Sequence, residues 1–221
     1  MRIATVKLRS AKNSPYSQSK YIEEPRSDKE TAKDFEERTW RHRLHVGDNG
    51  EVFIQPQAFT NGLRDAAQRS GKQIPGKGKA TYTKHFTSGV LVTEPVELGV
   101  KADAVDGEWL FVPSDGKRGG GKRVMKCFPK ITSWNGEVKF IIMDDMITKD
   151  VFAEMMNIFG TYVGIGRFRP QNGGYYGRFI VESIVWEESD LSGFGSSEED
   201  DLEASGSEEL EDAEELEEAL A

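Results

Sequence analysis

The sequence predicts an α+β fold of the split βαβ, ferredoxin-like kind, with an antiparallel sheet and two main helices. Three observations predict it. Arg2–Leu8 alternates apolar and polar residues, as a strand does. Two amphipathic helical patterns follow, one after Pro56 and one after Thr148. Strand patterns lie between the two helices and after the second, so the order is strand, helix, strands, helix, strand.

The first half of this order is one strand and one helix. Alternation in the strand places three apolar side chains on one face, those of Ala4, Val6 and Leu8. Pro56 opens the helix and Gly71 ends it, because proline suits the first helical turn and glycine suits the stop. The predicted buried side of this helix consists of Ala58, Leu63, Ala66 and Ala67.

Smaller elements are predicted between that strand and that helix. We expect a short helix over Asp28–Arg38 with Ser27 as its cap. We also expect Trp40–Val46 and Glu51–Ile54 to pair as a β-hairpin, because the Asn-Gly between them is a strong turn signal.

The second half begins with a basic connector over residues 72–89. Val90–Val92 and Trp109–Val112 are predicted to be short strands, and three consecutive glycines predict that residues 115–123 form a flexible basic loop. Glu137–Met143 is the clearest strand. Its predicted inward side chains are Val138, Phe140 and Ile142.

A helix capped by Thr148 and a final strand over Arg178–Trp186 complete the pattern. The apolar face of this helix consists of Val151, Phe152, Met155, Met156, Phe159 and Val163.

Charge is divided unequally along the chain. The whole sequence has a net charge of −9, from 29 Lys+Arg and 38 Asp+Glu. Residues 187–221 carry 16 of the acidic residues and none of the basic ones, so the body 1–186 has a charge of +7. The Ser-, Gly- and Glu-rich tail 187–221 holds a single aromatic residue, and we expect it to be disordered. The tail either solubilises the protein, competes with a polyanion for the basic body or docks a protein partner.

The cysteine count and the N-terminus predict a cytoplasmic protein. One cysteine excludes a disulfide framework and a Cys-rich zinc site, and we expect this residue, Cys127, to be buried. Lys7 lies where a signal peptide needs apolar residues, and no apolar stretch is long enough to cross a membrane. No histidine pair has metal-ligand spacing with a third ligand nearby, and we expect neither a metal nor a cofactor.

The most informative segment is the glycine-rich loop 164–178, which lies between the second helix and the last strand. It contains five glycines, three arginines and three aromatic residues. Glycines let a backbone approach a ligand closely, guanidinium groups bind phosphate, and aromatic rings stack on unpaired bases. The structural alternative is a tight turn whose arginines are merely solvated.

A helix, a Gly/Arg loop and a closing strand in this order resemble the RAMP superfamily, the repeat-associated proteins of CRISPR systems, which have RRM-like ferredoxin folds. The segment Phe53–Arg64 is similar to the early helix of that family, and its position places Arg64 on this helix. Lys117–Arg123 matches inserted loops of the family that touch nucleic acid. Gln55-Pro56-Gln57 departs from the usual Pro-Gly-Ser-like turn. The acidic tail is also foreign to the family and is similar in composition to the tails of bacterial and phage single-strand-binding proteins.

We therefore predict a non-catalytic protein that binds single-stranded nucleic acid, DNA in preference to RNA, in phage replication or recombination. Its phosphate contacts are predicted to be Arg41, Arg43, Arg64, Lys77, Lys79, Lys84, Lys117, Arg118, Lys122, Arg123, Arg167, Arg169 and Arg178. Bases are predicted to stack on Phe168, Tyr175 and Tyr176. The resemblance implies homo-oligomers or head-to-tail filaments along the strand.

Two other functions remain open at this point: a guide-RNA backbone subunit of a CRISPR-like complex, and a RAMP-type endoribonuclease. The endoribonuclease requires a histidine as general acid or base, and His42 and His85 are the candidates. A subunit-mimicking inhibitor is a further alternative. Asp144-Asp145 resembles the metal-binding pair of polymerase palms, but the chain lacks room for a fingers subdomain, and we expect this pair to end a strand.

Overall fold

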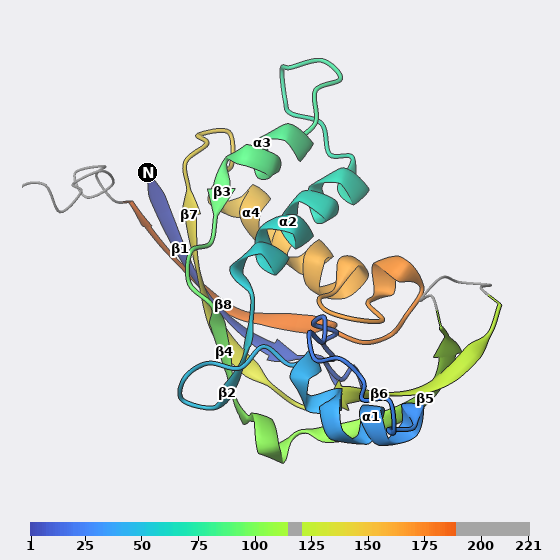
Figure 1. The fold of residues 1–221 in the computed structure, drawn as a ribbon. Coiled ribbons are helices and arrows are strands. Elements are labelled where there is room, and N and C mark those ends of the chain that lie inside the picture. Colours follow the sequence, from blue (N-terminus) through green and yellow to red (C-terminus); the bar gives the residue numbers. More distant parts are fainter. Residues whose placement is uncertain (115–120, 189–221) are drawn as a thin grey trace, which may run out of the picture. The chain divides into compact units, whose positions relative to one another are not determined.

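The computed structural model describes residues 1–114 and 121–188 (Figure 1). Its centre is a four-stranded sheet in the order β3-β7-β1-β8. The strands are β1 (Arg2–Ser10), β3 (Val90–Leu91), β7 (Asn135–Ile142) and β8 (Phe179–Glu188). β7 pairs antiparallel with both β1 and β3. β8 ends two residues beyond the predicted body, while the rest of the predicted tail and most of the predicted loop 115–123 lie outside the described residues.

Two helices, α2 (Pro56–Ser70) and α4 (Lys149–Ile158), lie on one side of this sheet (Figure 1). β1-α2-β3 and β7-α4-β8 are two split βαβ units, and the sheet order that they produce is ferredoxin-like. The predicted α+β, ferredoxin-like fold is therefore confirmed. Phe140 of β7 holds the layers together, because its ring contacts Phe59 of α2 at 6.2 Å and Phe152 of α4 at 5.1 Å between centroids.

The ends of both helices are set by the residues that the sequence indicates. Pro56 is the first residue of α2, and Gly71 follows its end with a φ of 60°. The Thr148 side chain accepts a hydrogen bond from the Val151 N–H at 3.3 Å and caps α4. α4 continues as a π-helical turn, Phe159–Val163, which contains the last two apolar residues of the predicted face.

The remaining strands form two separate ribbons. β2 (Glu51–Ile54) pairs with β4 (Val96–Lys101), and β5 (Asp106–Pro113) pairs with β6 (Arg123–Lys130), both antiparallel. β4 and β6 are not among the predicted strands, and the predicted strand Trp109–Val112 covers only the central part of β5. Short helices complete the described part of the chain: α1 (Ala32–Thr39), α3 (Thr83–Ser88), and 3-10 turns at Trp40–Arg43, Ala102–Ala104 and Pro170–Asn172.

The predicted strand Trp40–Val46 is wrong over its first residues, while its end pairs as expected, through an antiparallel bridge between Val46 and Val52. Its first residues form a 3-10 turn, because the Trp40 side chain is buried and packs against Gly107, where a Cβ would meet the indole ring at 3.2 Å. The predicted turn itself is present, since the Gly50 N–H donates to the Gly47 carbonyl at 2.9 Å. α1 begins later than expected, because Thr31 forms a capping box with Asp34 in place of the predicted Ser27 cap.

Candidate nucleic-acid interface

The glycine-rich loop 164–178 is wound tightly on itself. Positive φ angles occur at Gly164, Gly166, Gly173, Gly177 and Phe168. A Cβ at Gly177 would lie 2.8 Å from the carbonyl carbon of Ile165 and closer still to its oxygen. A Cβ at Gly174 would lie 2.9 Å from the Cα of Phe168. The loop's own backbone therefore accounts for Gly174 and Gly177 without any ligand.

Arg167 fastens the loop to the β5–β6 ribbon. Its guanidinium lies between two rings, 3.2 Å from the centroid of Phe128 on β6 and 3.7 Å from that of Phe168. Burial lowers the pKa of Arg167 to about 10, so the group is still charged at neutral pH. Its Nη1 is buried and has no hydrogen-bond partner among the described residues.

Two predicted phosphate contacts from distant segments converge on one acid. The buried Asp65 carboxylate accepts from Arg64 of α2 at 2.9 Å and from Arg169 of the loop at 3.5 Å. One negative charge thus orients two positive groups, which leaves a net positive charge and free N–H donors at the surface.

A charged cleft of about 350 Å³ lies where the loop meets the start of α2. The cations that line it are Lys20 and Arg167, and its wall includes Gln55, the residue before α2, and His45. The side chain of Gln55 forms no capping hydrogen bond with the backbone N–H groups at the start of α2. Burial and the charge of Lys20 lower the pKa of His45, so its ring is neutral at pH 7. Pro56 has no N–H and the Ala58 N–H donates to the Gln55 carbonyl at 3.0 Å, so the two cations are what make this cleft suited to an anion such as phosphate.

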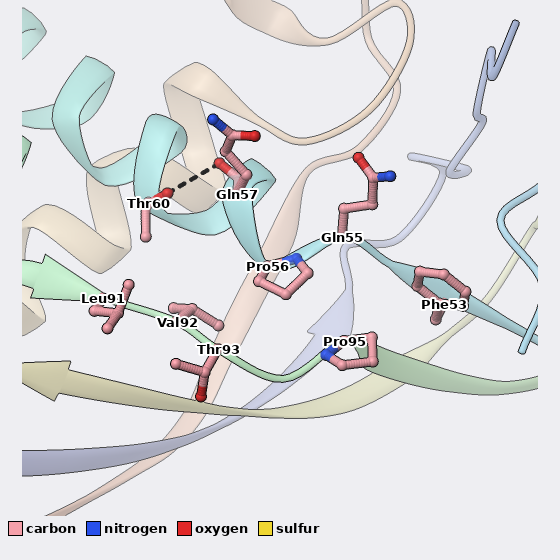
Figure 2. Close-up of a pocket in the computed structure, with 9 residues that line it drawn as sticks. All are labelled: Phe53, Gln55, Pro56, Gln57, Thr60, Leu91, Val92, Thr93 and Pro95. Atoms are coloured by element: carbon pink, nitrogen blue, oxygen red, sulfur yellow. Dashed lines mark hydrogen bonds between the residues drawn. The ribbon is translucent and has the colours of Figure 1, made fainter. Parts of the chain in front are cut away.

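A larger cleft, of about 690 Å³, lies on the other side of Pro56 (Figure 2). Figure 2 shows it between the start of α2 and the segment from Leu91 to Pro95. None of the nine residues that line it is charged. The two clefts therefore differ in chemistry, and only the charged one suits phosphate.

An aromatic cleft of about 400 Å³ separates the β5–β6 ribbon from the glycine-rich loop. Phe168 and Tyr175 line it from the loop and Phe111 lines it from β5, and all three side chains are exposed. Tyr176, predicted to stack on a base, is instead 2% exposed, and its hydroxyl donates to Glu108. Its ring is therefore part of the cleft wall and is not a free stacking surface.

The other predicted contacts are scattered. Arg43 is buried and donates to both carboxylate oxygens of Glu36, at 2.7 and 2.8 Å, so this ion pair is structural and Arg43 leaves the phosphate-binding set. Arg178 donates to the carbonyls of Thr161 and Tyr175 and braces the loop from within. Exposed positions are found for Arg41, Lys77, Lys79, Lys84, Lys122 and Arg123. Lys117 and Arg118 lie outside the described residues.

The two candidate catalytic histidines are both paired with acids. His42 contacts Glu24 at 2.9 Å, and His85 contacts Asp144 at 2.6 Å. Within residues 1–114 and 121–188, no group of three or more potential ligands is arranged to hold a metal ion. Cys127 is 1% exposed, which confirms its predicted burial. No helix of the described ranges is long and apolar enough to cross a membrane.

Three residues of these clefts are missing from the predicted set: Lys20, Phe111 and Glu108. Each lies outside the segment whose composition is unusual, and each reaches its cleft only through the tertiary fold. The alternation of Trp109–Val112 indicated a strand, but nothing in it showed which ring would face the loop.

No family model matches the chain, and no curated protein matches it in sequence. Among solved structures, it is similar to a chain from a cryo-EM structure of the Type III-B Cmr-beta complex bound to cognate target RNA, with a TM-score of 0.50 and 10% identity. This similarity concerns the fold alone. The match covers 85% of this chain and 61% of the solved chain, so the protein spans about three fifths of that subunit.

A second similar chain comes from a CRISPR RNA-guided surveillance complex. Its identity is also 10%, the match covers 81% of this chain and 67% of that one, and its TM-score of 0.37 carries no further argument. The similarity in fold to subunits of CRISPR complexes, which the glycine-rich loop predicted, is confirmed by the first match. Nothing in either comparison supports a role in phage replication.

Proposed function

We propose that this protein is a non-catalytic binder of single-stranded nucleic acid that acts on RNA, as a backbone subunit of an RNA-guided complex. The observation that carries the proposal is the charged cleft, in which Lys20 and Arg167 flank the start of α2 beside the glycine-rich loop. The similar solved complex is bound to target RNA, and this supports RNA in place of the DNA that we expected from sequence.

In this proposal, the strand runs along the glycine-rich loop. One phosphate occupies the charged cleft, and the pair Arg64 and Arg169, held by Asp65, binds another. Bases stack on the exposed rings of Phe168 and Tyr175.

The test is fluorescence anisotropy with labelled single-stranded RNA, single-stranded DNA and duplex RNA over a series of salt concentrations. The logarithm of affinity for single strands should fall with that of salt, and Lys20→Ala and Arg169→Ala should each reduce the slope by about 0.7. Lys139→Ala is the control, because Lys139 is exposed on the face of β7 opposite to the buried Val138 and Phe140. Absence of binding at low salt, or equal slopes for all three variants, would overturn the proposal.

The acidic tail is proposed to compete with nucleic acid for this basic surface or to dock a protein partner. Truncation after Glu188 keeps all of β8 and should tighten single-strand binding, most strongly at low salt. Unchanged affinity would exclude competition. Light scattering with and without an oligonucleotide tests the proposed assembly of copies along the strand.

Incubation of the protein with labelled RNA tests the endoribonuclease alternative. One observation favours this alternative: His85 is paired with Asp144, as a catalytic histidine is paired with the acid that orients it. We expect labelled RNA to remain intact with magnesium and with EDTA. Specific cleavage that is lost in His42→Ala or His85→Ala would replace the non-catalytic proposal.

A further inference from the structure

Three exposed aromatic residues, from two elements that the fold brings together, are among those that line the aromatic cleft, besides the buried Tyr176. Phe111 is 56% exposed, Phe168 is 41% exposed and Tyr175 is 56% exposed. The Arg123 guanidinium lies 5.4 Å from the Phe111 centroid and donates to the Phe111 carbonyl at 2.7 Å, which braces this wall. Large rings that are exposed around one cleft are stacking surfaces, because an unpaired base stacks on the face of an aromatic ring.

Glu108 also lines this cleft and is the only carboxylate that does so in the described part of the chain. Its Oε1 accepts from Lys130 at 2.7 Å, and its Oε2 accepts from the Tyr176 hydroxyl. Burial alone would raise the pKa of Glu108, but these two hydrogen bonds outweigh burial and lower it, so the group is ionised at neutral pH. The side chain retains 24% exposure. An ionised carboxylate accepts hydrogen bonds only, and each oxygen keeps a free lone pair.

We propose that this cleft is a base-recognition pocket that holds one unstacked nucleobase against its rings. Glu108 selects the donor-rich edge of guanine. The pocket thereby gives a sequence-tolerant binder a preference for one base at one position of the strand. The proposal rests on the proposed function, because a base reaches the pocket only if the strand follows the glycine-rich loop. Guanine presents two adjacent donors, N1–H and the 2-amino group, to the two oxygens of a carboxylate. Adenine and cytosine offer only an amino group there, and uracil offers only one N–H.

The experiment measures binding of a short uridine oligonucleotide that carries guanine, adenine, inosine or uridine at its centre. The guanine oligonucleotide should bind about fivefold or more tightly than the uridine one, since a good bidentate contact discriminates by at least this factor. Inosine lacks the 2-amino group and should lose most of the gain. Equal affinity of guanine, inosine and uridine oligonucleotides for the intact protein overturns the pocket without any variant.

Glu108→Gln is the decisive variant. A carboxamide keeps the size of the side chain and an acceptor for Lys130, but it presents only one acceptor oxygen to the base. The preference for guanine should disappear while the affinity for the uridine oligonucleotide stays within about twofold. A thermal melt checks that the variant is folded. A folded variant that still prefers guanine refutes the role of Glu108.

Stacking is tested separately with Phe111→Leu and Tyr175→Leu. Each removes one ring, and each should weaken the guanine oligonucleotide about 5- to 150-fold and relieve the quenching of a central 2-aminopurine. Tyr21→Leu is the matched control, because Tyr21 is 82% exposed and lines neither the charged nor the aromatic cleft. If the oligonucleotides bind but both ring variants behave like the control, the pocket is wrong and the proposed function survives. If no oligonucleotide binds, the proposed function itself fails.

Discussion

Gly177→Ala should damage this protein far more than the same change at Gly76, although both glycines have nearly the same backbone conformation. The φ angles are 70° and 74°, and a left-handed residue with a Cβ costs about 1–2 kcal/mol. A Cβ at Gly76 meets nothing within 4 Å. A Cβ at Gly177 overlaps the backbone of Ile165, whose N–H donates to the Gly177 carbonyl at 2.9 Å, so relief of the overlap breaks the loop's own hydrogen bond.

The expected free-energy costs are about 1–2 kcal/mol for Gly76→Ala and more than about 4 kcal/mol for Gly177→Ala, a value reached by few single substitutions. For a chain of this size, the first cost lowers the melting temperature by roughly 2–8 °C. The second lowers it by more than about 10 °C or prevents folding. Thermal denaturation followed by far-UV circular dichroism measures both. Melting temperatures within 2 °C of each other would show that the loop does not need glycine for close packing.

Three further predictions concern buried and paired groups. Glu36→Gln removes the partner of the buried Arg43 and should cost about 3–5 kcal/mol in urea denaturation, whereas Glu37→Gln, in an exposed i,i+4 pair, should cost about 0.5 kcal/mol at most. Asp144 has a lowered pKa because hydrogen bonds from the Met146 N–H and His85 outweigh burial. Its contribution to stability is therefore complete above about pH 4 and is lost below it. Asp144→Asn should have a lower melting temperature than the intact protein at pH 7, and the two melting temperatures should converge toward pH 2. Burial and the nearby Glu36 raise the pKa of the Cys127 thiol to about 11, so an aromatic disulfide reagent at pH 8 should react with it only in denaturant, and rapid reaction of the native protein would contradict its burial.

The parts of the fold that the sequence predicts correctly are those with a strong period and a defined end. β1 and β7 show regular alternation of burial, and α2 and α4 combine an apolar face with a proline, a stop glycine or a cap, so local preference agrees there with tertiary packing. β6 contains Pro129, a residue type that disfavours strand interiors; in the structure it lies next to the strand's last residue and is matched with Gly107 of β5.

Other elements depend on contacts between distant segments. The alternation of Trp40–Val46 has the period of a strand, but burial of the indole and the pairing of Arg43 with Glu36 favour a 3-10 turn. The candidate interface likewise has one part that the sequence predicts and one part that only the fold places. The loop itself is legible in the composition of residues 164–178, while its partners Lys20, Phe111 and Glu108 are placed by the fold.

The tight winding of residues 164–178 also divides the loop into positions that must stay small and positions that are free to vary. Gly164, Gly166, Gly174 and Gly177 follow the spacing G-x-G-x7-G-x2-G, and each is held by steric contact with the chain itself. Among the side chains between them, the ring of Tyr175 is exposed and meets no such constraint. Distant relatives with this loop should keep the spacing while exchanging the side chains that choose a ligand, so the four-glycine pattern is a means of finding them where overall identity has fallen to the level of chance.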